Sequence, residues 1–249
     1  MHKFFTPKEN IIDSFAKILG DDVKHIYKVL RLSEGDEVVL NDCEGLEYLA
    51  SITDISKSEV NLKIIEKLDT NNESRVNITL FQGMPKAQKM DLIVQKGTEL
   101  GISLFKPVIT ERVDVKLKGD FKKLDRLNRI ALEACKQSKR SVIPKVLDPI
   151  TFESLLEEIK EYDLVLVPYE NQEGYGIKKL SKEVSKGDIK DVCIIVGPEG
   201  GFEESEISKL KSSGAKIITL GKRILRTETA GFVAASLIQY EFADLGGIE

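Results

Sequence analysis

Several residue types and patterns are scarce in this sequence, and each scarcity excludes a class of protein. No apolar run approaches the roughly 18 residues that a membrane-spanning helix needs. Two histidines and three widely spaced cysteines, Cys43, Cys135 and Cys193, provide neither a zinc-binding spacing nor a disulfide framework. Residues 1–9 do not have the pattern of a signal peptide. We therefore expect a cytoplasmic protein with no metal and no membrane segment, in which Cys135 and Cys193 are small core residues.

Phosphate-binding loops are also missing, although two glycine-rich turns are present. Neither G-x-G-x-x-G nor G-x-x-x-x-G-K-[ST] occurs near the turns at 197–202 and 220–231, each of which follows an apolar run and precedes a helical pattern. In the first turn, Pro198 removes a backbone donor and Glu199 adds a carboxylate, so a di- or triphosphate is disfavoured. An uncharged or cationic ligand fits better. The alternative is that the glycines only make tight turns and Glu199 is solvated.

The chain changes character near residue 70. Residues 1–70 are rich in short alternating β patterns, at Val38–Leu40, Tyr48–Ile55 and Val60–Ile65, with one helical pattern at Asp22–Leu32. Polar residues 68–75 read as a linker. From residue 76 onward, strand and helix patterns alternate, which predicts a parallel sheet covered on both faces. The predicted strands are Val76–Gln82, Leu104–Ile109, Asp163–Val167, Val192–Val196 and Lys216–Leu220, and the predicted helices are Lys89–Leu100, Phe121–Cys135, Phe152–Ile159, Ile177–Ser185 and Phe232–Phe242.

Three of these predicted strands end in loops that should meet. The loops are Pro168–Glu170, Gly197–Phe202 and Gly221–Thr227. Open α/β sheets bind ligands outside the carboxyl ends of their strands, so three adjoining loops at one edge predict a single pocket. At the helix that follows the third loop, either Thr227 or Thr229 is expected to be the N-terminal cap, and Thr151 is expected to cap the helix at Phe152.

Positive charge is concentrated in one stretch of a chain whose net charge is −4. Residues 112–145 hold 11 Lys and Arg against 4 Asp and Glu, which could form an electrostatic footprint for phosphates. The alternative is a solvated helix face.

Several motifs together resemble one known family. They are Gly197–Phe202, Leu220–Ala230, Lys89–Asp91, Lys96–Gly101 and Glu133–Ser138. Together, these motifs resemble those of the RsmE family of the SPOUT superfamily, which methylates N3 of one uridine in bacterial 16S ribosomal RNA. The resemblance covers nearly the whole chain. It implies a PUA-like RNA-binding β-barrel domain at 1–70 and a SPOUT-type α/β methyltransferase domain at 76–249, with a trefoil knot at about 163–230. It also implies a homodimer acting on the small ribosomal subunit.

The resemblance further implies S-adenosylmethionine as cofactor, a ligand with a sulfonium cation and no phosphate. The residues implied to line the cofactor pocket are Val167, Pro168, Glu170, Val196, Gly197, Pro198, Glu199, Gly201, Leu220, Gly221, Ile224, Leu225, Arg226 and Thr229. We expect Arg226 to stabilise the uracil anion and Glu228 or Glu199 to balance its charge. The alternative is that Arg226 and Glu228 pair only to brace the loop.

Phosphate contacts are expected from Lys3, Arg31, Arg112 and Arg140. The sequence departs from the family pattern at Lys3, Lys139 and Lys222, where the family usually has Arg, Gly and Pro. These departures bear on RNA contacts. Two other functions remain open at this point. One is a related methyltransferase acting on another ribosomal or transfer RNA base, and the other is a ribosome-assembly factor that binds RNA without catalysis.

Overall fold

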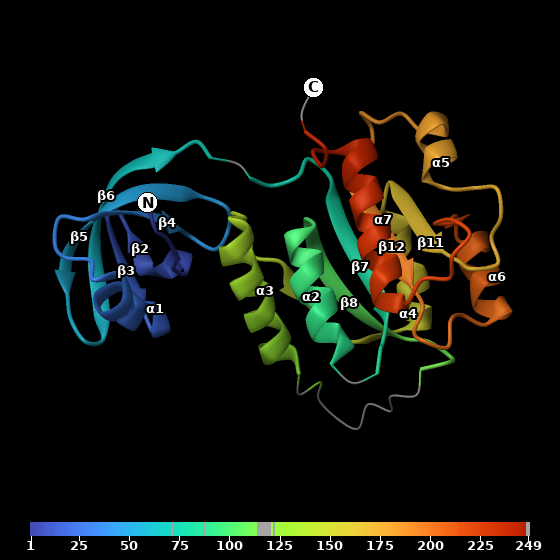
Figure 1. Ribbon diagram of the computed structural model, residues 1–249, viewed down its shortest axis with the longest axis horizontal. Coiled ribbons are helices and arrows are strands. Elements are labelled where there is room, and N and C mark those ends of the chain that lie inside the picture. Colours follow the sequence, from blue (N-terminus) through green and yellow to red (C-terminus); the bar gives the residue numbers. More distant parts are fainter. Residues whose placement is uncertain (71, 87, 114–120, 122, 248–249) are drawn as a thin grey trace. The chain divides into compact units, whose positions relative to one another are not determined.

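The computed structural model describes residues 1–70, 72–86, 88–113, 121 and 123–247 (Figure 1). These residues belong to two compact units. The first is Met1–Glu73 together with Cys135–Ile143, and the second is Ser74–Ala134 together with Pro144–Glu249. Packing therefore groups the segment 135–143, which the sequence pattern placed in the second domain, with the β-rich first unit.

The first unit is a curled six-stranded sheet with a short helical segment, drawn in blue to cyan in Figure 1. Its strand order is β1-β4-β5-β6-β3-β2, in which only the β1–β4 pair is parallel. The strands are β1 (Lys3–Phe5), β2 (Ile11–Ile12), β3 (Phe15–Leu19), β4 (Glu37–Asn41), β5 (Glu47–Ile55) and β6 (Glu59–Leu68). A 3₁₀ turn spans Lys8–Asn10, and α1 (Asp21–Lys24) runs into a π-helical turn at His25–Leu30. The predicted strands and helix of this region are confirmed, whereas β1, β2 and β3 were not predicted.

The alternation of inward and outward side chains along each strand explains the core of this unit. Inward residues of successive strands, such as Ile18, Leu40, Ile52 and Leu62, are at most 1% exposed, and the helical segment adds Ile26. The missed strand β3 has the same alternation, but its outward positions Phe15 and Leu19 are also apolar. Periodicity alone therefore gave no polar face by which to recognise it.

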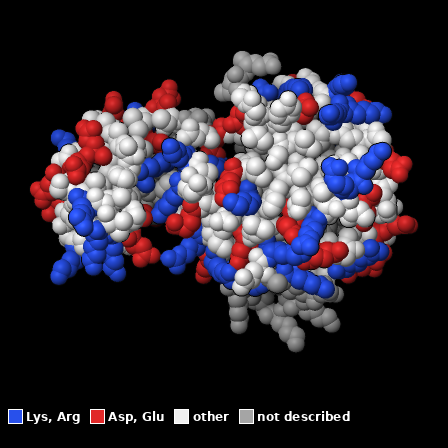
Figure 2. All heavy atoms as spheres, viewed as in Figure 1, with Lys and Arg blue, Asp and Glu red and all other residues white. Residues whose placement is uncertain are grey.

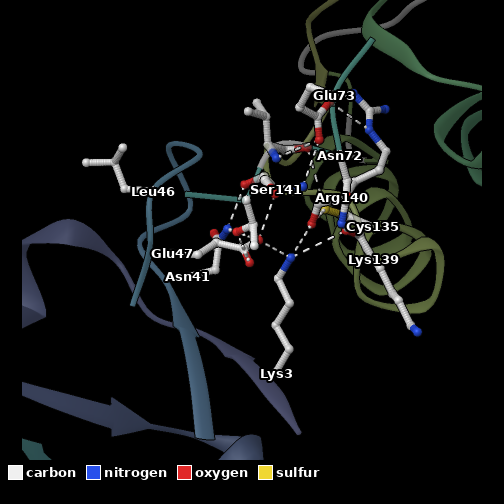
Figure 3. A network of polar contacts seen from close by, with 12 residues as sticks. Lys3, Asn41, Leu46, Glu47, Asn72, Glu73, Cys135, Lys139, Arg140 and Ser141 are labelled. Atoms are coloured by element: carbon white, nitrogen blue, oxygen red, sulfur yellow. Dashed lines mark hydrogen bonds and ion pairs between the residues drawn. The ribbon is translucent and has the colours of Figure 1, made fainter. Parts of the chain in front are cut away.

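A network of polar side chains holds the segment 135–143 to the rest of the first unit (Figure 3). Both carboxylate oxygens of Glu73 are used. One accepts from the backbone N–H groups of Ser141 at 2.7 Å and Val142 at 3.0 Å. The other accepts from Arg140 Nε at 3.0 Å and Nη2 at 2.6 Å. Glu73, a residue of the predicted linker, is therefore a structural anchor.

Lys3 and Glu47 form the second half of this network. Lys3 Nζ donates to the Arg140 carbonyl at 3.0 Å and forms an ion pair with Glu47. Glu47 also accepts from Ser141 Oγ at 2.7 Å and Thr70 Oγ1 at 2.8 Å. Burial alone would raise the pKa of Glu47, but the hydrogen bonds from Lys3, Ser141 and Thr70 hold it below its ordinary value.

The helix that enters this segment ends at a lysine in a left-handed conformation. Lys139 has φ of 59°. Its N–H donates to the Lys136 carbonyl, and the Arg140 N–H donates to the Cys135 carbonyl. This pair of bonds is a Schellman motif, in which the residue at the left-handed position is usually glycine. The departure at Lys139 thus places a strained residue at a helix end.

The second unit is a parallel seven-stranded sheet with helices on both faces. Its strand order is β10-β8-β7-β12-β11-β13, and β9 pairs with β8. The strands are β7 (Asn77–Gly83), β8 (Ile102–Ile109), β9 (Lys145–Val146), β10 (Ile150–Thr151), β11 (Leu164–Pro168), β12 (Asp191–Val196) and β13 (Lys216–Ile218). The helices are α2 (Lys89–Glu99), α3 (Leu124–Ser138, whose last turn joins the first unit), α4 (Phe152–Glu158), α5 (Ile177–Glu183), α6 (Glu204–Ser212) and α7 (Thr227–Phe242), and a 3₁₀ turn spans Ile159–Glu161.

Two hydrophobic clusters cover the two faces of this sheet. Adjacent residues of one strand enter opposite clusters: Ile194 packs with residues of α2 and α7, whereas Cys193 and Ile195 pack with residues of α4 and α6. Cys135 and Cys193 are fully buried, so the prediction that both are core residues is confirmed. The prediction of a parallel sheet covered on both faces is also confirmed.

The two predicted helix caps have different outcomes. Thr151 accepts from the Ser154 N–H at 3.1 Å and caps α4, as predicted. The prediction of a threonine cap at α7 is wrong, because Arg226 occupies the N-cap position with no side-chain cap hydrogen bond, and Thr227 and Thr229 lie in the first turn. The Thr227 hydroxyl bonds to a neighbouring loop instead, as described below.

Replacing Glu47 with glutamine should destabilise the protein at neutral pH. The Glu47 side chain is 5% exposed, and losing its charged hydrogen bonds should lower the free energy of unfolding at pH 7 by about 2 kcal/mol. Because the folded-state pKa is depressed, this stabilisation is complete above the unfolded-state value of about 4.3 and is lost as pH falls through the folded-state pKa. Thermal unfolding of Glu47→Gln and the parent should therefore converge only as pH falls through the depressed folded-state pKa of Glu47.

The control for this experiment is Glu44→Gln. The Lys8–Glu44 ion pair spans 2.9 Å, but both side chains are more than 60% exposed, so its loss should leave unfolding nearly unchanged. Equal effects of the two substitutions, or a difference independent of pH, would contradict the assignment of Glu47 to a buried charged network.

Replacing Lys139 with glycine should stabilise the protein. Glycine relieves the left-handed strain of a lysine, and we expect a gain of about 0.5 to 1 kcal/mol in the free energy of unfolding. Lys209→Gly, within the right-handed backbone of α6, is the control and should cost about 1 kcal/mol. Chemical denaturation would measure the free energy of unfolding of both variants. A loss of stability in Lys139→Gly would contradict the inference that Lys139 is strained.

Candidate functional site

Three loops of the second unit enclose a cavity at the carboxyl ends of adjacent strands. β11 lies between β12 and β13, so the loops after these strands are neighbours, as predicted. The cavity has a volume of about 400 Å³, within the range of about 300–1,000 Å³ typical of ligand sites. It is lined by Lys89, Pro168, Glu170, Val196, Gly197, Pro198, Glu199, Gly200, Gly201, Phe202, Ile224, Leu225, Arg226, Thr227 and Ala230.

A second hollow adjoins this cavity. It shares Pro168, Glu170, Ile224, Leu225 and Ala230 with the first, and adds Tyr169, Thr219, Leu220, Gly221, Lys222 and Arg223. Twelve of the predicted cofactor residues therefore line one hollow or the other. The exceptions are Val167, which is fully buried in the core, and Thr229, which is half-buried in the first turn of α7. Both are absent from the lining because their side chains pack within the fold.

The second and third loops are joined by the Thr227 side chain. Its hydroxyl donates to the Gly197 carbonyl at 2.6 Å and accepts from Gln82 Nε2 at 2.8 Å. Gln82 is fully buried near the end of β7, and its Oε1 has no hydrogen-bond partner in the part of the chain that the structure describes. One side chain thus connects the carboxyl ends of β7 and β12 with the start of α7. The sequence analysis did not single out Gln82.

Gly83, also missed, allows the second loop to lie against β7. A Cβ atom placed at Gly83 would lie 2.5 Å from both the backbone N and the Cδ of Pro198. Such a contact requires the backbone of the loop to move. The signal in the sequence was available, because a glycine at the end of a predicted strand often marks a close approach of another backbone segment.

The cavity carries a cluster of two carboxylates and one ammonium group. Lys89, the first residue of α2, lies 3.0 Å from Glu199 Oε1 and 3.5 Å from Glu228 Oε2. Glu199 also accepts from the Lys86 backbone N–H at 3.0 Å. Burial works to raise the pKa of Glu199, but the hydrogen bond from Lys89 and the backbone bonds bring it below its ordinary value. Glu199 therefore keeps its negative charge beside the Lys89 ammonium group.

Arg112 braces the second loop. Its Nε donates to Glu203 Oε1 at 2.6 Å, and its Nη1 donates to the Gly200 carbonyl at 2.8 Å. The hydrogen bond to Glu203 raises the pKa of Arg112 and lowers that of Glu203. The structure therefore gives Arg112 a role in holding the loop, next to the cavity that Gly200 lines.

Arg226 lies at the cavity with its side chain exposed. Among the residues that the structure describes, its guanidinium pairs with no carboxylate, whereas Glu228 pairs with Lys89. The alternative in which Arg226 and Glu228 only brace the loop is therefore not what the structure contains. Arg226 remains available to contact a substrate.

The other predicted phosphate contacts divide into two kinds. Lys3 and Arg140 are only 17% and 7% exposed, and both are part of the network around Glu47 and Glu73. Their cations therefore hold the first unit together. Arg31 is exposed, with φ of 55°, at the end of the π-helical turn. It is the member of this set best placed to reach phosphate.

The basic stretch 112–145 is largely balanced by acidic residues. Arg126 pairs with Asp91, Lys136 with Asp22, and Arg140 with Glu73. Lys116, Lys118 and Lys122 of this stretch lie outside the described residues. Figure 2 shows Lys and Arg side chains interspersed with Asp and Glu on this face of each unit. The described part of the stretch is thus closer to an ion-paired helix surface than to a phosphate footprint.

The described residues include neither a helix suited to crossing a membrane nor a side-chain cluster suited to holding a metal ion. None of their helices is both long and apolar enough to cross a membrane. No group of three or more His, Cys, Asp or Glu side chains in this part of the chain could hold a metal ion.

Comparison with known proteins gives the family. Residues 72–239 match the RNA methyltransferase domain family, and residues 18–65 match the RNA methyltransferase PUA domain family. Ribosomal RNA small subunit methyltransferase E of Bacillus subtilis (strain 168) is 38% identical over 92% of this chain and 91% of its own length. The enzyme of the same name from Aquifex aeolicus (strain VF5) is 32% identical over 96% of this chain and 99% of its own.

A solved structure agrees with these matches. Ribosomal RNA small subunit methyltransferase E from Neisseria gonorrhoeae, bound to S-adenosyl methionine, superposes with a TM-score of 0.81 and 32% identity, covering 98% of this chain and 99% of that one. The fold, the glycine-rich loops and the full-length matches therefore lead to one conclusion. This chain belongs to the ribosomal RNA small subunit methyltransferase E family.

Proposed function

We propose that this protein methylates N3 of a uridine in 16S ribosomal RNA, with S-adenosylmethionine as the methyl donor. The observation that carries the proposal is the cavity between the three loops, whose lining has carboxylates at Glu170 and Glu199 and contains no phosphate cradle. Membership of the family supports the same reaction. The choice of N3 rests on the family resemblance, and the chemistry below describes what this site offers for it.

The lining suits S-adenosylmethionine. Glu170 and Glu199 add negative charge beside the cavity, and Pro198 removes a backbone donor that a phosphate would need. Backbone groups of Gly197 to Gly201 and of Leu220 to Leu225 would hold the adenosine part, and the apolar side chains of Phe202 and Ile224 would cover it. When bound, S-adenosylmethionine supplies a methyl group on a sulfonium cation.

N3 of uridine carries a proton, so methyl transfer requires loss of that proton and stabilisation of the resulting anion on the flanking oxygens. The N3 edge must also be unpaired for it to reach the site. Arg226, exposed at the cavity, is the cation that we propose to face one of these oxygens. Glu199 and Glu228 balance the positive charges of Lys89 and Arg226, and Glu170 adds a further carboxylate that offsets the repulsion between Arg226 and the sulfonium.

RNA binding is proposed for the first unit. Arg31 is the predicted phosphate contact that we propose binds RNA, because Lys3 and Arg140 are committed to the buried network. Arg112 is committed to Glu203 and Gly200, so it would act on RNA only through the loop that it braces.

A homodimer is also part of the proposal. The outward face of α7 is apolar, with half-buried Phe232, Val233 and Leu237 and with Tyr240, whose residue exposure is 64%. An apolar helix face next to a binding site suits contact with a second copy of the chain.

The trefoil knot at about 163–230 and a cytoplasmic location complete the proposal. Support for the knot comes from the loop after β11, where Gly176 bridges to Thr219 and the Tyr175 carbonyl accepts from the Thr219 N–H at 2.8 Å. The loop therefore runs beside the exit of β13. A cytoplasmic location follows from ribosomal RNA as substrate.

The function can be tested by mass spectrometric mapping of methylated nucleotides. Small-subunit RNA from cells with and without the gene, and RNA treated with purified protein and S-adenosylmethionine, should differ by one N3-methyluridine. Methylation of another base would favour the related-enzyme alternative. Cofactor binding without any methylated product would favour the non-catalytic assembly factor.

Replacing Gly83 with alanine should weaken cofactor binding. The added Cβ would meet the backbone of Pro198 at 2.5 Å and displace the second loop, so affinity for S-adenosylmethionine should fall by about tenfold or more. Gly187→Ala is the matched control, because a Cβ there has nothing within 4 Å and the residue is not in a left-handed conformation. Titration calorimetry measures both, and equal affinities in the two variants would contradict the proposed position of the cofactor.

Replacing Arg226 with alanine should reduce turnover while leaving cofactor affinity within about twofold. The expected loss is about 100-fold in kcat, the scale for removing one donor that stabilises a developing anion. Methyl transfer to small-subunit RNA and calorimetry with S-adenosylmethionine provide the two measurements. Unchanged turnover would remove Arg226 from the mechanism.

A further inference from the structure

Lys89 occupies a position that helix stability does not explain. It is the first residue of α2, and the first turn of a helix carries a partial positive charge that disfavours a cation. The side chain instead reaches the cavity between the three loops, which it lines together with Arg226 and Pro198. The family motif Lys89–Asp91 therefore contains one residue that faces the site.

Two carboxylates from different elements fix the Lys89 ammonium group. Glu199 belongs to the loop after β12, and Glu228 lies in the first turn of α7. Their oxygens lie 3.0 Å and 3.5 Å from Nζ, and the Lys89 side chain is 31% exposed. A lysine stem has four rotatable bonds, so two restraints of this kind hold an otherwise mobile charge at one place.

An ammonium group has three donors; Glu199 at 3.0 Å takes up one of them, and Glu228 Oε2, which has no hydrogen-bond partner among the described residues, lies 3.5 Å away on the side of a second. One N–H direction is left for an acceptor in the cavity. The hydrogen bond that Lys89 donates to Glu199 raises the pKa of Lys89, so the group is a cation and not a general base. Arg226 differs, because among the described residues no carboxylate holds its guanidinium in place.

We propose that Lys89 is a further catalytic residue, which donates a hydrogen bond to one uracil oxygen beside N3 while Arg226 faces the other. The inference rests on the proposed function. N3 loses its proton to solvent, and the electron pair left on N3 forms the bond to the methyl carbon. The carbon–sulfur bond breaks at the same time, and the sulfonium becomes a neutral thioether. Lys89 stabilises the negative charge that the uracil oxygens carry before the methyl group arrives.

The arrangement also explains the two acids. A fixed cation beside a sulfonium would repel the cofactor if it were alone, whereas Glu199, Lys89 and Glu228 together have a net charge of −1. The cluster can therefore offer a positive donor to the substrate and a negative environment to the cofactor. Glu170 in the same lining adds to the second effect.

The test compares Lys89→Met and Lys89→Arg with the parent enzyme, using methyl transfer to small-subunit RNA. Lys89→Met keeps the apolar stem and removes the donor, so kcat at pH 7 should fall by about 100-fold. Higher pH ionises uridine N3 without help from the protein, so the loss should shrink as pH rises from 7 to 9.5. Lys89→Arg keeps a positive donor and should retain more activity than Lys89→Met at pH 7.

Cofactor binding and a second lysine provide the controls. Affinity for S-adenosylmethionine, measured by calorimetry, should change less than threefold in Lys89→Met. Lys96→Met, on the same helix with its ion pair to Glu99, should behave like the parent. If kcat of Lys89→Met falls by the same factor at every pH, or falls only because cofactor affinity is lost, Lys89 is a structural brace and the proposal is overturned. Full activity of Lys89→Met would also overturn it. If the parent itself methylates no uridine N3, the proposed function fails instead.

Discussion

The site depends on one hydroxyl group. Thr227 bonds to the Gly197 carbonyl and to Gln82, so the end of β7, the loop after β12 and the start of α7 are held at a common point. Without this connection, the three loops would still follow adjacent strands, but the second loop would lose its direct hydrogen bond to the start of α7. The position of Lys89 depends on the same point, because its two carboxylates come from the two elements that Thr227 joins.

Much of the architecture was predictable because it rests on periodicity. Alternation in β11 and β12, helical spacing in α2 and α7 and the change of pattern near residue 70 each follow from which side chains must be buried. The convergence of the three loops was also predictable, because neighbouring parallel strands place their carboxyl ends at one edge of the sheet. β1 and β2 are too short to show a period, and β3 has apolar residues on both faces, so pattern reasoning missed all three.

The partners of charged residues could not be predicted, because they are set by contacts between residues far apart in the chain. Lys3, Arg112 and Arg140 looked like phosphate ligands in the sequence, yet their acceptors are Glu47, Glu203 and Glu73. The approach of Gly83 to Pro198 has the same origin, since it depends on the neighbouring positions of β7 and β12. In this chain, the glycine at the end of β7 was a more informative signal than the cluster of basic residues.

The placement of residues 135–143 has a consequence for how the two units are connected. The chain passes from one unit to the other near residues 73–74, 134–135 and 143–144, so three covalent connections join them where a simple linker would supply one. A protease that cuts within 68–75 would leave strands β1 to β6 with no covalent link to the rest of the chain, so that noncovalent contacts with 135–143 would hold them. Equally, residues 1–70 expressed alone would lack Glu73, Arg140 and Ser141, and would expose the buried carboxylate of Glu47 without its partners. The first unit is thus completed by a segment that the chain supplies only after the sheet of the second unit has begun.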